Sequence, residues 1–227
     1  MPTKPRRRRP RLKPATSVSQ SEHEFRTLTS AFASLQLADI PFQAQHYILK
    51  ALQCRLEQCG FEFLQRCSLS EIQPVEWGCP EEMELPKLFG VLRKSFGFLN
   101  SKAIMSWKRQ ITEIRHAAVH RVAQNRHSIC KKLDAAVAFA KSLEDFKCAE
   151  DIRLFKLSLD DLLADLDERS KQLVWRTKAQ LYLCRCHPLR LRRRFLLLPE
   201  AVKRMAEQNE CHFNSLVQST LRNCLSP

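Results

Sequence analysis

The stretch ITEIRHAAVHRVAQNRHSICKKLDAAVAFA, residues 111–140, repeats apolar side chains at intervals of three and four residues. At about 100° per residue, these side chains gather on one side of a helix, and that side must face a core. They are Ile111, Ile114, Ala118, Val122, Ile129, Leu133 and Ala140. Arg115 falls in the same apolar arc, so its guanidinium needs a partner or a functional reason to be there. The stretch predicts helical packing and leaves open whether the helix breaks near residues 123–125.

The same helical period recurs along the chain, in segments separated by prolines and polar residues. Helices are expected from about Ser21, from about Asp39 to Phe63, over about 88–99, from Asn100 or Ser101, from about Asp151 to Cys184, and from Pro199 to Leu221. Only 4 residues are glycine, which leaves few positions for tight hairpins, and no strand pattern is found. The sequence therefore predicts an all-α fold, a helical bundle with a disordered basic N-terminal arm.

Two arginine-rich runs account for nearly all of the formal net charge of +14. Residues 1–20 form the expected disordered basic tail, residues 21–184 the bundle, and residues 185–227 a basic linker followed by a C-terminal helix. The candidate nucleic-acid-binding residues are Arg6, Arg7, Arg8, Arg9, Arg11, Arg190, Arg192, Arg193 and Arg194. RNA or another polyanion is the partner that such runs attract. No aromatic residue interleaves within either run, so base stacking is not expected there.

The chain shows no apolar run long enough for a membrane span and no secretory signal at its start. An intracellular protein without membrane contact is therefore expected, with its ten cysteines reduced. The cluster KPRRRRPRLK, residues 4–13, is typical of a nuclear localisation signal, so a nuclear protein is expected.

The histidines in the opening stretch allow a metal-binding interpretation. His116, His120, His127 and Cys130 fall within roughly 80° of one another on one straight helix, opposite the apolar face. Arginines and lysines interleaved among them would repel a divalent cation. A second group, Cys184, Cys186 and His187 with the distant Cys211 and His212, lacks the usual spacing of zinc ligands. Neither a metal site nor a cofactor is expected from these patterns.

The segment RHAAVH, residues 115–120, resembles the signature of the HEPN superfamily (higher eukaryotes and prokaryotes nucleotide-binding). That signature is an arginine, often followed by Asn, Asp or His, and then a histidine after four to six intervening residues. Members are helical bundles, often dimeric, and many are metal-independent endoribonucleases. The resemblance implies Arg115 and His120 as a catalytic pair, supported by His116, and it implies a homodimer as a candidate assembly. Histidine titrates near neutral pH and arginine matches phosphate geometry, which suits RNA cleavage.

Two function classes stay open. The first is an RNA-engaging helical protein, either a metal-independent endoribonuclease or a binding protein without activity. The second is a non-catalytic module that binds a protein partner through apolar helices and uses its basic tail only for nuclear import. In the second class, the His and Arg side chains are a solvated helix face, and Arg115 pairs with an acid from a neighbouring helix.

Overall fold

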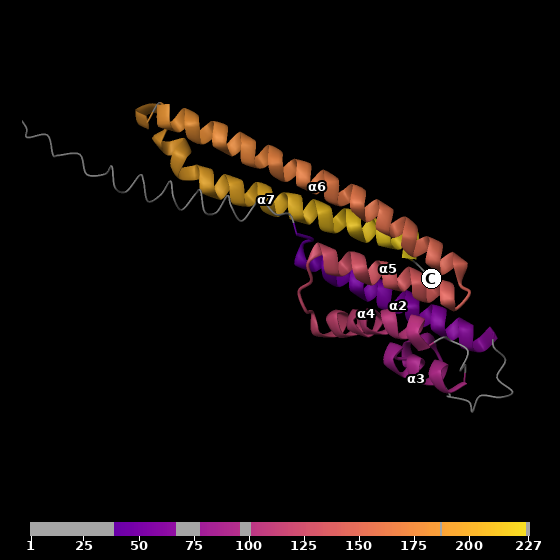
Figure 1. Ribbon diagram of the computed structural model, residues 1–227. Helices are drawn as coiled ribbons and strands as arrows, with labels where there is room; N and C mark the ends of the chain where they lie inside the picture. Colours follow the sequence, from indigo (N-terminus) through magenta and orange to yellow (C-terminus); the bar gives the residue numbers. More distant parts are fainter. Residues whose placement is uncertain (1–38, 67–77, 96–100, 187, 226–227) are drawn as a thin grey trace, which may run out of the picture. The chain divides into compact units, whose positions relative to one another are not determined.

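The computed structural model describes residues 39–66, 78–95, 101–186 and 188–225, and its helices are shown in Figure 1. The helices are α2 (Phe42–Arg66), the 3₁₀ turn η1 (Pro80–Glu82), α3 (Leu85–Ser95), α4 (Ser101–His120), α5 (Arg126–Ser142), α6 (Phe146–Cys186) and α7 (Pro188–Leu225). No strand occurs in this part of the chain, so the predicted all-α fold is confirmed. The described residues all belong to the unit Leu37–Pro227. The basic tail and the helix expected from Ser21 lie outside them.

Helix α2 is the centre of the core, since it contacts each of the other described helices and η1. Its apolar residues recur every three or four positions, as the sequence predicts, and Ile48, Leu52 and Leu56 are completely buried. They join apolar residues of α3, α4, α5, α6 and α7 in one continuous cluster. At roughly 25 cal/mol per Å² of apolar surface, this burial is the main favourable contribution to folding.

A glycine allows the region around α3 to approach α2 closely. A Cβ atom on Gly60 would lie 2.8 Å from Cε of Met83 and would also overlap a methyl group of Leu88. Both partners are completely buried. The glycine therefore sets how near η1 and α3 can pack to α2.

The helical stretch at residues 111–140 is broken after His120. Arg121 adopts a left-handed conformation with φ of 51°, and α5 begins only at Arg126. Asn125 caps α5 by accepting a hydrogen bond from the Ser128 backbone N–H at 2.8 Å. The break also explains a difference from the sequence analysis: Val122 follows the end of α4 and is 40% exposed instead of facing the core.

The boundary between the last two helices differs from the one expected from the sequence, which placed a basic linker after residue 184 and a helix start at Pro199. Helix α6 continues to Cys186, α7 already begins at Pro188, and Pro199 lies inside α7. Proline is favoured at the first position of a helix, where its missing N–H has no partner to lose. At Pro199 an internal hydrogen bond is missing, and α7 is bent in its N-terminal part (Figure 1). Buried Leu198 on one side of this proline, and the packing of α7 along α6, offset that loss.

Among the described helices, none is apolar over a stretch long enough to cross a membrane.

Candidate functional site

Arg115 is held by an acid next to α3. Its Nη2 atom donates a hydrogen bond to Oε1 of Glu84 at 2.8 Å. The two side chains are 32% and 36% exposed, so the pair lies at the edge of the core instead of inside it. An acid from a neighbouring helix was expected as the partner of Arg115, as one alternative. The partner instead comes from the residue that precedes α3, and this ion pair ties α3 to α4.

The two histidines of the motif lie together on the surface. The ring centroids of His116 and His120 are 4.6 Å apart, and both residues are exposed near the C-terminus of α4. In the described part of the chain, no hydrogen bond joins Arg115 to either ring. The structure thus brings the two histidines together and directs the guanidinium of Arg115 to Glu84.

The break after His120 divides the proposed metal stripe between two helices. His127 and Cys130 lie on α5, whereas His116 and His120 lie on α4. Burial raises the pKa of the Cys130 thiol. Within the described residues, metal-ligating atoms converge in another place, at Cys59, Asp145 and Cys148.

Two acids of α6 pair with an arginine at the start of α5. Arg126 lies 3.7 Å from Asp160 and 3.4 Å from Asp167, and Asp165 pairs with Arg169 one turn along α6. The backbone N–H of Arg126 also donates to Asp39 at 3.0 Å. These bonds orient α5 on α6, so this acidic face stabilises the bundle.

A buried lysine holds the connection between α4 and α5, and the sequence analysis missed it. Lys132 donates to Gln124 and Ser128, both at 2.8 Å, and its Nζ lies 3.6 Å from a carboxylate oxygen of Glu113. Burial lowers the pKa of this ammonium, and Glu113 opposes the shift. Gln45 accepts a hydrogen bond from the Gln124 backbone N–H at 2.7 Å. The loop at residues 122–125 is therefore fixed from several sides.

The distal half of α6 carries a stripe of exposed aromatic and basic side chains, here called the α6 stripe: Lys171, Trp175, Lys178 and Tyr182. On a helix these four positions fall within about 60° of one another. Trp175 is 71% exposed and Tyr182 69% exposed, and both lysines are exposed. The opposite face of the same stretch is buried, including Leu173 and Thr177, and α7 packs along α6. Two large aromatic rings are thus exposed to solvent on the same face as two lysines, and α7 covers the opposite face of the helix.

The α6 stripe was not predicted from the sequence. No base stacking was expected, because no aromatic residue interleaves within either arginine run. The signal was present in the sequence as the spacing of residues 171, 175, 178 and 182 along one helix face. The spacing alone does not show whether this helix face is exposed or buried. That depends on which face of α6 is covered by α7.

The arginines of the two runs lie outside what the structure describes in detail. Arg6, Arg7, Arg8, Arg9 and Arg11 precede the described residues. Arg190, Arg192, Arg193 and Arg194 belong to the first turns of α7, but their side chains lie outside the described atoms. In sequence, this second run follows directly after the helix that carries the α6 stripe.

No protein-family model, no curated protein and no solved structure matches this chain.

Proposed function

We propose that the protein binds RNA, and that single-stranded RNA stacks on the α6 stripe. The observation that carries this proposal is the exposure of Trp175 and Tyr182, at 71% and 69%, on the helix face that also carries the exposed Lys171 and Lys178. Every base has a π-face, so aromatic rings of this kind accept single strands with little dependence on sequence. The neighbouring cations supply the attraction to phosphate that precedes stacking.

The distribution of charge along α6 supports this position for the strand. The half of α6 nearer its N-terminus carries Asp160, Asp161 and Asp165, which would repel phosphate. After Arg169 the chain holds no acid until Glu200, while the α6 stripe and the second arginine run lie between them. A polyanion is therefore attracted to the end of α6 at which the aromatic rings are exposed.

RNA cleavage is a second candidate, favoured by the contact between the His116 and His120 rings. The resemblance to the HEPN superfamily supplies the roles: His120 as the general base at the 2′-hydroxyl, Arg115 as the cation at the phosphate, and His116 as support. For this chemistry, Arg115 has to break its hydrogen bond with Glu84, or it has to bind phosphate through the guanidinium N–H groups that do not contact Glu84. Binding requires no such rearrangement, and so it is the leading proposal. A homodimer in which a second copy completes the site belongs to the cleavage candidate.

The proposal is tested by measuring the affinity for a fluorescent single-stranded oligonucleotide at fixed salt. Trp175→Ala and Tyr182→Ala should each weaken binding about 5- to 150-fold, which corresponds to the roughly 1–3 kcal/mol of one stacked base. Phe146→Ala is the matched control. Phe146 is 68% exposed on the same helix, but it is the first residue of α6 and belongs to the acidic N-terminal half. An unchanged affinity in both stripe variants would refute stacking on the α6 stripe and leave the protein-binding module as the alternative function.

Nuclear localisation belongs to the same proposal and rests on the cluster at residues 4–13 alone. Deleting residues 1–14 should move a fluorescent fusion from the nucleus to the cytoplasm. Unaltered nuclear accumulation would remove the import role from this cluster.

A further inference from the structure

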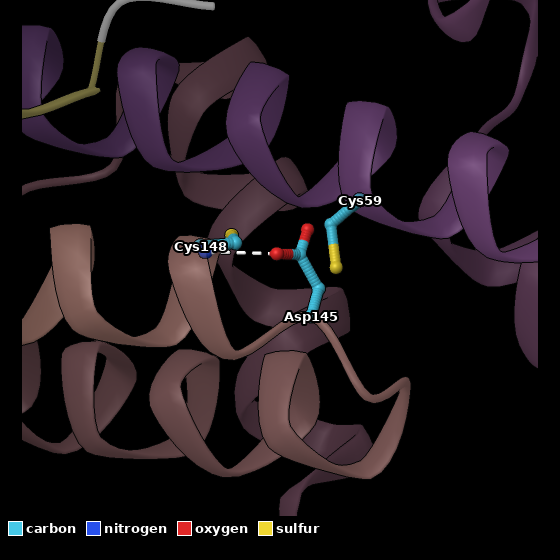
Figure 2. A group of neighbouring side chains, drawn as sticks. All are labelled: Cys59, Asp145 and Cys148. Carbon is cyan, nitrogen blue, oxygen red and sulfur yellow. Dashed lines mark hydrogen bonds between the residues drawn. The ribbon is translucent and has the colours of Figure 1, made fainter.

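Three potential metal ligands converge in the core, far from the α6 stripe. The Sγ atoms of Cys59 and Cys148 and a carboxylate oxygen of Asp145 all lie within 4.8 Å of one another. Figure 2 shows Cys59 reaching from α2 toward Asp145 and Cys148 at the start of α6. Both cysteines are completely buried, and Asp145 is only 8% exposed.

The backbone holds this cluster in a fixed geometry. Asp145 caps α6 by accepting the Cys148 backbone N–H at 2.9 Å, and its own N–H donates to Ala140 at 3.0 Å. The preceding residue, Glu144, has a left-handed φ of 57°. Arg66, the last residue of α2, donates to the Leu143 carbonyl at 2.9 Å. The turn between α5 and α6 is therefore anchored to the helix that supplies Cys59.

We infer that Cys59, Asp145 and Cys148 bind a zinc ion that fastens α2 to the start of α6. In a tetrahedral zinc site, with Zn–S near 2.3 Å and Zn–O near 2.0 Å, neighbouring ligand atoms are roughly 3.3–3.8 Å apart. The three ligand atoms already lie within 4.8 Å of one another, so small side-chain rotations bring them to coordinating distance. The cluster supplies three of the four ligands of a tetrahedral site.

The ligand set is suited to a thiophilic divalent cation. Without a metal, the hydrogen bond with Cys148 and burial raise the pKa of the Cys59 thiol well above its ordinary value. Zinc would replace the proton of each thiol, and both protons would leave to solvent. The two thiolates and the carboxylate carry three negative charges against the two positive charges of the ion, so the bound site keeps one negative charge in place of a lone cation in the apolar core. The N-terminus of α6 also stabilises the thiolate of Cys148.

Cobalt(II), which is spectroscopically visible in zinc sites, provides the test on the full chain under reducing conditions. One equivalent should give thiolate-to-cobalt absorption, and zinc should displace it. Cys59→Ser and Cys148→Ser should each weaken or remove the absorption. The double variant Cys184→Ser and Cys186→Ser should keep it, which separates the core cluster from the other cysteine-rich segment.

Asp145→Asn separates metal binding from folding, since asparagine also caps helices well. This variant should fold and melt as the parent does without metal, whereas zinc should raise Tm of the parent more than Tm of the variant. The absence of stoichiometric cobalt binding by the parent would overturn the site. Cobalt absorption that persists in both core cysteine variants would also overturn it, as would recovery of a Cys59–Cys148 disulfide from protein whose thiols were blocked at lysis.

Discussion

Replacing Arg115 and Glu84 singly and together measures whether their ion pair holds α3 to α4. In a double-mutant cycle of Arg115→Met and Glu84→Gln, the two changes should be non-additive because each removes the same contact. The N–O distance is 2.8 Å and the side chains are 32% and 36% exposed. Two unit charges at about 4 Å attract by roughly 4 kcal/mol at an effective dielectric constant near 20, before solvation and entropy are subtracted.

Double-mutant cycles on exposed ion pairs give coupling energies of about 0.2–1 kcal/mol. Because the contact between Arg115 and Glu84 is short and partly buried, we place its coupling energy near the upper end of that range. We therefore expect a coupling of about 1 kcal/mol in the free energy of unfolding, measured by urea denaturation. The control cycle uses the more exposed pair Arg169 and Asp165, 42% and 49% exposed on α6, for which about 0.3–0.5 kcal/mol is expected. Additivity within about 0.3 kcal/mol at Arg115 and Glu84 would refute the structural role of the pair.

Three further predictions concern the core, the histidines and the second arginine run. Gly60→Ala should lower the free energy of unfolding by about 1 kcal/mol, because overpacking against Met83 and Leu88 outweighs the gain in helix propensity. A variant that is more stable than the parent would contradict the close approach of η1 and α3 to α2. If the parent cleaves RNA in chelator and leaves a 2′,3′-cyclic phosphate, His120→Ala should slow cleavage about 10²- to 10⁴-fold without unfolding, since His120 is exposed. Unchanged cleavage by the folded variant would end the catalytic assignment. Replacing Arg190, Arg192, Arg193 and Arg194 with Gln should reduce the slope of log affinity against log salt, by as much as about 3 if each arginine neutralises one phosphate; an identical slope would show that this run does not touch RNA.

The helical class was predictable because the apolar residues of α2, α5 and α6 keep a helical period over many turns. Ile48, Leu52 and Leu56 recur at intervals of four residues within the helix expected from about Asp39 to Phe63, and they are completely buried. Pro199 was predicted to start a helix, because proline is favoured at the first helical position. It lies inside α7 instead, since packing along α6 offsets the missing hydrogen bond.

The candidate sites were harder to predict because they depend on contacts between distant residues. Glu84 lies just before α3 and pairs with Arg115 on α4. The spacing of apolar residues around either position does not predict this contact. Cys59 and Cys148 belong to different helices, and they meet only because the turn before α6 is anchored to α2. The break at Arg121 separates the histidine stripe, and it depends on loop contacts made by Gln45 and Asp39.

The most direct test of RNA binding by the α6 stripe is the fluorescence of Trp175 itself. The chain contains 3 tryptophans, so Trp77→Phe with Trp107→Phe leaves Trp175 as the only indole. Titration with single-stranded RNA should quench its emission to saturation, because a stacked base contacts the ring, and added salt should reverse the quenching as phosphate contacts are lost. Emission that stays constant while anisotropy shows the RNA to be bound would contradict the account.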